Sequence, residues 1–147
     1  MKLRLIVALA LAGFCVPVWA WWNEEWQFRK ELTVDAGSAG LGVDEALTDV
    51  PVLVRLHMGN FSYFDDVRAD AADIRVFADE DRTPLAYRVE RFDPVNRIGL
   101  VWIRLPQVVP AQVQVLHMYY GNPDAANGAD AAAVFDTSTA VALDFAG

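Results

Sequence analysis

The chain has few of the residues that build disulfides, metal sites and nucleophilic centres. It contains one cysteine, Cys15, and two histidines, His57 and His117, among 147 residues. Cys15 lies in a hydrophobic run near the N-terminus, so the sequence after that run has no disulfide, thiol nucleophile or cysteine metal ligand. The sequence also has no Gly-x-Ser-x-Gly, no His-Glu-x-x-His and no phosphate-binding loop. These absences exclude the commonest thiol, serine and zinc chemistries.

Positive charge is scarce as well. Lysine and arginine number 12 against 20 aspartates and glutamates, which gives a net charge of −8. No basic stripe is present to displace counterions from phosphates, so we expect no nucleic-acid partner. Binding to anionic lipid is disfavoured for the same reason. With 54% hydrophobic residues, the chain has enough apolar surface for the core of about one domain.

Residues 1–20 have the layout of a secretory signal peptide. Two basic residues in "MKLR" precede the uncharged run "LIVALALAGFCVPV", and Ala20 provides a small residue for cleavage after position 20. The alternative is an uncleaved membrane anchor, because residues 5–22 carry no charge and approach the length of a span. Both interpretations predict an exported protein, periplasmic or extracellular. Contact with the membrane is expected only through an uncleaved leader or a missing downstream part.

Behind the leader, apolar and polar residues alternate in six segments separated by Gly, Pro, Asn and Asp. Such alternation with a period of two predicts half-buried strands. With no convincing helical period, it predicts an all-β, antiparallel, jelly-roll-like β-sandwich over residues 21–136. We expect residues 137–147 to be a tail or the start of a missing downstream domain. The six predicted strands are residues 26–34, 50–56, 73–78, 84–92, 98–105 and 112–120.

Some finer features follow from the same patterns. Residues 98–105 are apolar on both faces and predict a central strand, so Trp102 is expected in the core. Trp26 is expected to begin the core. Tyr119 and Tyr120 should point to opposite faces, one buried and one exposed. Residues 63–73 are expected to hold one short helical turn, and the alanine-rich residues 124–134 a linker or a weak helix.

Several blocks of sequence, in a fixed order, resemble a bacterial domain of unknown function, DUF2341. These blocks are "WWNEEWQFRKELTVD", "DVPVLVRLHMGNFSYFDDVRADAADIRVFADEDRTPLAYRVERFDP", "VWIRLP" and "MYYGNPDA". The resemblance extends from Trp21 to Asp136. It is strongest to the N-terminal copy in exported MotA/TolQ/ExbB proton-channel family proteins, in which a second, laminin-G-type sandwich and the membrane channel follow. This sequence stops at "VFDTSTAVALDFAG", so the channel is not implied, and we expect a fragment or a truncated chain.

Acidic residues are the first group of candidate site residues. Asp65, Asp66, Asp70 and Asp73 fall in one loop, where their oxygens are weak candidates for calcium ligands, although the order of an EF-hand loop is missing. A pair of carboxylates about 5–10 Å apart across a cleft could instead hydrolyse glycosides. The third interpretation is a solvated acidic loop. No cofactor other than calcium is suggested, and no other metal.

Aromatic residues are the second group. Trp21, Trp22 and Tyr120 are candidate binding contacts, because sugar rings stack on exposed aromatic faces. Alternatively, these rings seal the edge of the sandwich or an interface. The two histidines are expected to be packed or to lie at a rim.

Three functions remain open. The first is a non-catalytic, exported β-sandwich module of an envelope protein that binds a glycan or another envelope protein. The second is the extracytoplasmic domain of a MotA/TolQ/ExbB-type proton-channel protein whose membrane part is missing here. The third is a glycan-active enzyme that uses the acidic loops. We expect the chain not to be an enzyme.

Overall fold

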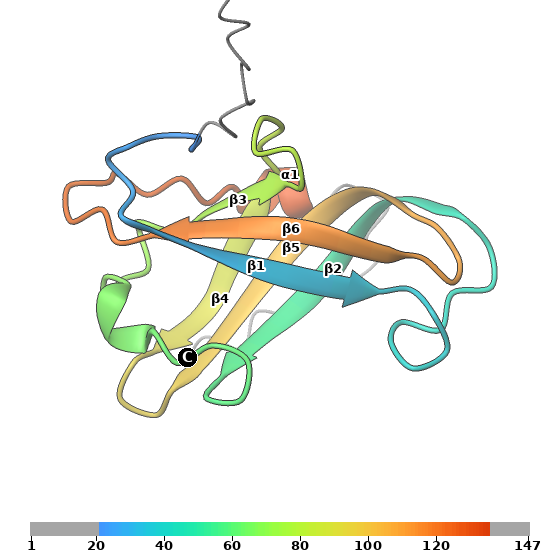
Figure 1. Cartoon of the computed structure of the whole chain (residues 1–147), viewed down its shortest axis with the longest axis horizontal. Coiled ribbons are helices and arrows are strands. Elements are labelled where there is room, and N and C mark those ends of the chain that lie inside the picture. Colours follow the sequence, from blue (N-terminus) through green and yellow to red (C-terminus); the bar gives the residue numbers. More distant parts are fainter. Residues whose placement is uncertain (1–20, 136–147) are drawn as a thin grey trace, which may run out of the picture.

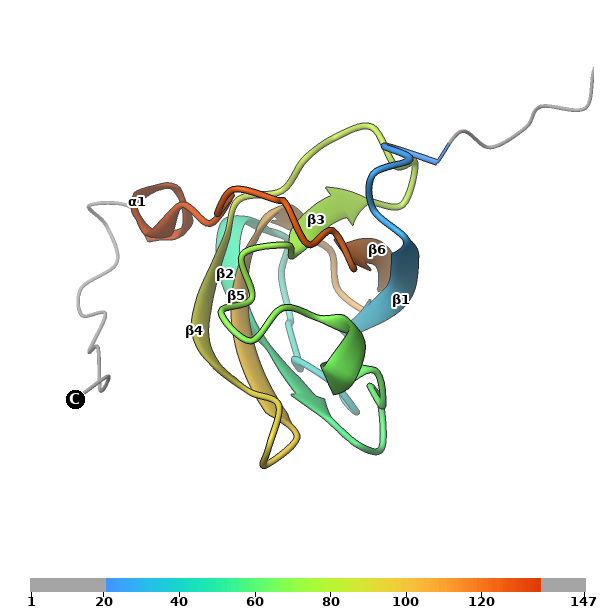
Figure 2. The ribbon, with the colours of Figure 1, turned by 90° about the vertical axis from the view of Figure 1, so that its left-hand side faces the viewer.

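The computed structural model describes residues 21–135, which form two three-stranded antiparallel sheets packed face to face (Figures 1 and 2). Sheet A has the strand order β1-β6-β3 and sheet B the order β2-β5-β4. The predicted antiparallel β-sandwich is confirmed, and each of the six predicted segments overlaps one strand. The strands are β1 (Phe28–Asp35), β2 (Leu47–His57), β3 (Arg75–Ala78), β4 (Tyr87–Asp93), β5 (Ile98–Val108) and β6 (Val113–Tyr120).

The predicted signal peptide, its cleavage after Ala20 and the predicted tail of residues 137–147 lie outside the described residues. Between residues 21 and 135, no helix is long and apolar enough to cross a membrane.

The core lies between the inward faces of the two sheets. Alternate residues of β5, Val101, Ile103 and Leu105, are buried, and the same alternation in β6 buries Leu116 and Met118. β5 lies between β2 and β4, as its apolar pattern predicts. The core is completed by further residues from β1–β4 and the loops, among them Leu32, Val34, Val52, Leu56, Phe61, Phe64, Ile74, Val76 and Tyr87.

Within residues 21–135, two short helices accompany the sheets. The 3-10 helix η1 (Phe64–Asp66) provides the helical turn predicted in residues 63–73, and Phe64 points into the core. The alanine-rich stretch ends in α1 (Ala131–Val134), where the Asp130 carboxylate accepts a hydrogen bond of 3.0 Å from the Ala133 N–H. This is an N-cap, which satisfies one of the free amides at the start of the helix.

The segment before β1 covers the outer face of sheet A with aromatic rings. We call Trp21, Trp22 and Trp26, together with Phe77 and Tyr119, the aromatic cap. The Trp22 ring centre lies 4.7 Å from that of Trp26 and 4.5 Å from that of Phe77. Trp26 is buried, as predicted, but it packs in a second apolar cluster on the outer face of sheet A rather than between the two sheets.

The aromatic cap also changes the environment of the two tyrosines at the end of β6. Tyr119 and Tyr120 point to opposite faces, but both are buried. Tyr120 lies in the core, and Tyr119 lies under the tryptophans. The prediction that one of them is exposed is wrong, since alternation cannot reveal that a preceding segment covers the outer face.

Trp102 also differs from the prediction, which placed it in the core. Its side chain leaves the outer face of β5 and is half-buried rather than in the core. Its ring centre lies 5.4 Å from that of Phe135, and its Nε1–H donates to the Glu90 carboxylate. The polar indole N–H thus finds its partner on the solvent side of sheet B.

Candidate functional site

An open groove lies at the end of the sandwich where β1 begins and β6 ends, beside η1; Figure 2 looks onto this end. We call it the Phe28 groove. Its volume is about 360 Å³. It is lined by Gln27, Phe28, Asp65, Asp66, Val67, Arg68, Asp73, Gly121 and Pro123.

Two partly exposed aromatic rings stack on Tyr120: Phe28 lines the groove, and Tyr63 directly precedes η1, which contributes Asp65 and Asp66 to the lining. Phe28 is 38% exposed and Tyr63 is 48% exposed. The Phe28 ring centre lies 5.5 Å from that of Tyr120 at an angle of 28°, and the Tyr63 ring centre lies 6.4 Å away at 30°. Phe28 and Tyr120 are also partners in the β1–β6 register. Tyr120 thus supports two aromatic rings that remain partly exposed to solvent.

The hydroxyl of Tyr120 stays protonated over the physiological range. Burial, together with the nearby Asp66 carboxylate and Tyr63, raises the pKa of Tyr120 to about 12. Tyr120 therefore acts as a neutral aromatic support behind the groove.

The floor of the Phe28 groove is fixed by Asp73, which is fully buried. One carboxylate oxygen accepts from the main-chain N–H of Arg68 at 3.1 Å, and the other from that of Gly121 at 2.7 Å. Its carbonyl oxygen accepts from Trp26 Nε1 at 2.6 Å. Asp73 therefore joins the loop before β3, the end of β6 and the aromatic cap.

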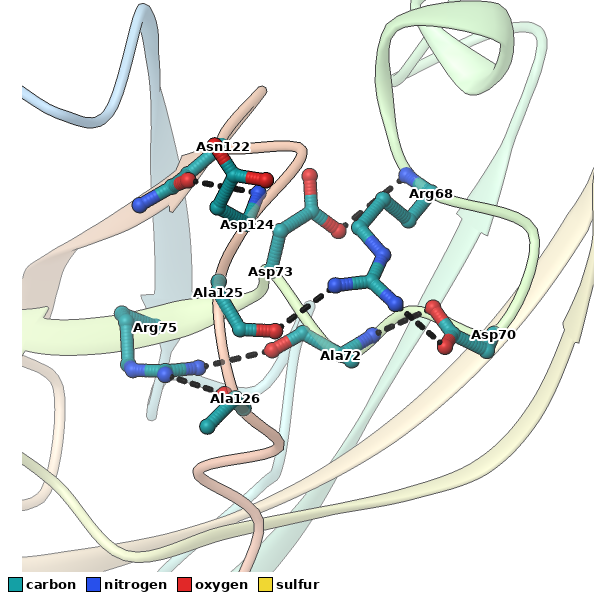
Figure 3. A network of polar contacts seen from close by, with 9 residues as sticks. All are labelled: Arg68, Asp70, Ala72, Asp73, Arg75, Asn122, Asp124, Ala125 and Ala126. Atoms are coloured by element: carbon teal, nitrogen blue, oxygen red, sulfur yellow. Dashed lines mark hydrogen bonds and ion pairs between the residues drawn. The ribbon is translucent and has the colours of Figure 1, made fainter.

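Two arginines extend this network to the segment after β6 (Figure 3). The Arg68 guanidinium donates to Asp70 at 2.8 Å and to the Ala125 carbonyl at 2.7 Å. The Arg75 guanidinium donates to the carbonyls of Ala72 at 2.9 Å and Ala126 at 2.6 Å. These hydrogen bonds connect the segment after β6, which contributes Gly121 and Pro123 to the groove, to the acidic loop before β3.

The four aspartates that we considered for calcium serve different purposes. Asp65 pairs with Arg97 at 2.8 Å, Asp70 pairs with Arg68, and Asp73 accepts main-chain hydrogen bonds. Asp66 lines the groove and has no ion-pair partner among the described residues. Within residues 21–135, no three histidine or acidic side chains are grouped so that they could hold a metal ion. The structure does not bring the four carboxylates together as one set of ligands.

Trp21 and Trp22 lie with Tyr119, not with Tyr120. The Trp21 ring is 39% exposed and meets Tyr119 edge-on at 5.3 Å. Arg29 lies 5.5 Å from the centre of the Trp21 ring, and Trp21 Nε1 donates to the Trp26 carbonyl at 2.8 Å. The three aromatic candidates from the sequence are thus divided between the outer face of sheet A and its inner face.

The two histidines lie far apart in the fold and have different environments. His57 is exposed at the end of β2, where its Nδ1 accepts from the Gly59 N–H at 3.0 Å. His117 is buried beside the aromatic cap, with Nδ1 at 2.9 Å from the Asp81 carboxylate, which also pairs with Arg29. The contact between His117 and Asp81 is not aligned as a hydrogen bond, and neither atom has another partner among the described residues.

Sequence reasoning missed Phe28 and Tyr63. The pattern put Phe28 on the same face as Leu32 and Val34, and the structure agrees, but Phe28 is the first residue of its strand. It therefore lies at the open end of the sandwich rather than inside it. Tyr63 lies in a loop, where no periodicity applies. One signal was available for Phe28: it is an aromatic residue at the start of one strand, and Tyr120 is an aromatic residue at the end of another.

Comparison with known proteins yields one match. Neither a curated protein nor a solved structure matches the chain. Residues 70–139 match the family described as "Domain of unknown function (DUF2341)". The match contains Asp73, Gly121 and Pro123 of the Phe28 groove, whereas Phe28, Tyr63 and η1 precede it. From Asp70 to Thr139, the chain is thus similar to DUF2341, which confirms that part of the resemblance.

Proposed function

We propose that the chain is a non-catalytic, exported β-sandwich module of a cell-envelope protein, and that it binds glycans in the Phe28 groove. The observation that supports this most is the pair of rings, Phe28 and Tyr63, each stacked on Tyr120 and partly exposed to solvent. Sugars bind to such rings through C–H contacts. The Asp66 carboxylate, which has no ion-pair partner within residues 21–135, and the Gln27 amide line the same groove, as acceptors and donors for sugar hydroxyls.

The arrangement of acids favours binding over hydrolysis. Asp65 and Asp66 are consecutive residues of η1, so they come from one turn rather than from two sides of a cleft. The third acid in the groove, Asp73, is fully buried, and both of its carboxylate oxygens accept main-chain hydrogen bonds. Glycosidases place their carboxyl groups on opposite sides of the scissile bond. A glycan-active enzyme is the alternative, and turnover of a bound glycan that is lost in Asp66→Asn would establish it.

A glycan array with the purified protein tests the proposal. The parent should bind at least one class of glycan, and Phe28→Ala and Tyr63→Ala should each weaken binding about tenfold or more, the equivalent of about 1.4 kcal/mol. Val113→Ala is the matched control, because Val113 is 60% exposed at the start of β6, at the other end of that strand from the groove. No binding by the parent, or equal losses in all three variants, would contradict the proposal.

A second candidate places this module at the front of a MotA/TolQ/ExbB-type proton-channel protein. It is supported by the order of the sequence blocks and by the DUF2341 match over residues 70–139. The test is the coding DNA beyond the codon for Gly147. An in-frame second sandwich followed by membrane spans is expected, and a stop codon there would remove this candidate.

A further inference from the structure

β2 is an edge strand of sheet B, and part of its outer edge is open. Among residues 21–135, β2 pairs with β5 alone and on one side only (Figure 1). The register with β5 runs from Leu47 to His57 without a shift. In an antiparallel strand, the N–H and C=O of every second residue point away from the partner strand.

Contacts at the end of β2 identify which residues point outward. Asn60 accepts from the His57 N–H at 2.8 Å and donates to the Arg55 carbonyl at 2.8 Å, so the main-chain groups of residues 55 and 57 face the open edge. By alternation, the N–H and C=O of Leu53 and the C=O of Pro51 face the same way. None of them has a hydrogen-bond partner among residues 21–135. Pro51 and Asn60 thus bracket a short open edge centred on Leu53.

An apolar groove runs beside this open edge. Its volume is about 780 Å³, and it lies between β2 and the loop before it. Leu53 is 42% exposed at its rim. We call it the β2 groove; it is lined by Leu41, Gly42, Val43, Asp44, Glu45, Leu47, Val50, Pro51, Val52, Leu53 and Val108.

The negative charge beside this edge favours a positively charged partner. Asp44 and Glu45 are exposed in the loop that forms one wall, and neither has an ion-pair partner among the described residues. An extended peptide with apolar residues on one face and lysine or arginine on the other would complement both the groove and these carboxylates. Strand addition of this kind takes affinity from main-chain hydrogen bonds and specificity from alternate side chains.

We propose that the β2 edge binds an extended, cationic peptide segment of a partner protein by strand addition, with apolar side chains in the β2 groove. This site is separate from the Phe28 groove and does not depend on glycan binding. Its occupant pairs with Leu53 and places its basic residues beside Asp44 and Glu45.

Fluorescence anisotropy of a labelled synthetic peptide with alternating valine and lysine tests the proposal. The full chain should bind this peptide. It should bind the same peptide much more weakly when glutamate replaces lysine. N-methylation of alternate peptide nitrogens should abolish binding, because it removes the main-chain donors. Higher salt should weaken binding, since the charges concerned are exposed.

Leu53→Pro is the informative variant, because it removes an outward N–H without breaking the ladder to β5. It should weaken binding about tenfold or more, whereas Leu53→Thr keeps the N–H and should stay within about threefold of the parent. Asp44→Asn with Glu45→Gln should remove the preference for lysine. Binding unchanged in Leu53→Pro, or equal binding of the N-methylated peptide, would overturn the proposal. So would a parent that binds no peptide but forms a dimer that Leu53→Pro dissociates, since the occupant would then be a second copy.

Discussion

The Asp73 carboxylate accepts a hydrogen bond of 2.7 Å from the main-chain N–H of Gly121, across 48 residues of sequence. It connects the loop that enters β3 to the turn that leaves β6, and both line the Phe28 groove. The other carboxylate oxygen is also used, by the Arg68 N–H. A single buried side chain thus fixes the geometry of the candidate site.

Asp73→Asn is therefore expected to destabilise the protein. An amide offers one acceptor where the carboxylate offers two, so one main-chain N–H is left without a partner at a cost of about 1–3 kcal/mol. Urea unfolding followed by tryptophan fluorescence measures this loss. Asp79→Asn is the control, because Asp79 is exposed in the turn after β3. Equal stabilities of the two variants would contradict the role given to Asp73.

The aromatic cap predicts unequal effects for its tryptophans. Trp26 is 6% exposed and donates to the Asp73 carbonyl, so Trp26→Ala should cost about 3–5 kcal/mol. Trp21 is much more exposed and contributes mainly its contacts with Arg29 and Tyr119, so Trp21→Ala should cost about 1 kcal/mol. Denaturation midpoints of the two variants measure the difference, and the reverse order would mean that residues 21–26 do not pack as described.

Asp81 links two partners beside the aromatic cap, because its carboxylate contacts both Arg29 and His117. Asp81→Asn keeps the side-chain size at a position with positive φ, where asparagine is tolerated, but removes the charge. We expect a loss of about 1–3 kcal/mol. The stability lost through Asp81→Asn should be smaller in an Arg29→Met background, because the ion pair between Asp81 and Arg29 is already absent there. A double-mutant cycle measures that coupling, and a coupling of zero would show the contact to be unimportant.

Alkaline pH should destabilise the fold through its buried tyrosines. Burial raises the pKa of Tyr120 to about 12 and also raises the pKa values of Tyr119 and Tyr87. In the unfolded chain, tyrosine ionises near pH ~10. Stability is therefore fully present below about pH 10 and is lost as the pH rises through about 12, because the unfolded state releases these protons first.

Urea midpoints between neutral and alkaline pH check this prediction. Tyr120→Phe has no proton to release at that position, so its stability should fall less steeply than that of the parent. The same alkaline slope in both proteins would show that Tyr120 is not protected in the folded state.

The strands were predictable from the sequence because alternation records which residues face opposite sides of a sheet. The pattern did not reveal which side is covered. Trp102 and Tyr119 show both kinds of error: Trp102 is apolar but leaves the outer face of sheet B, and Tyr119 leaves the outer face of sheet A but is buried by Trp21 and Trp22. Covering segments come from elsewhere in the chain, and local periodicity carries no information about them.

The end of β5 illustrates another limit. The pattern ended the strand at Leu105 because Pro106 follows, but β5 continues to Val108. Pro106 is tolerated because no residue of β4 lies opposite it: the pairing of β4 with β5 reaches only as far as Ile103, which is opposite Tyr87. β2 still pairs with β5 on the other side, from Leu105 to Val108. A missing donor has little effect at a position where no partner strand is present.

The candidate site was less predictable than the fold. The acidic loop and Tyr120 were singled out from the sequence, and the structure places Asp65, Asp66 and Asp73 in the groove that Tyr120 supports from behind. Phe28 also lines that groove and Tyr63 directly precedes η1; both were missed because their exposure depends on where the sheets end.

The most direct test is to map a bound glycan on the protein by the changes it causes in backbone amide NMR shifts. The proposed function predicts that a glycan selected by array perturbs residues around Phe28, Tyr63 and Gly121, and that the perturbations disappear in Phe28→Ala. Perturbations confined to Trp21 and Trp22, or to the outer face of sheet B around Trp102, would contradict it.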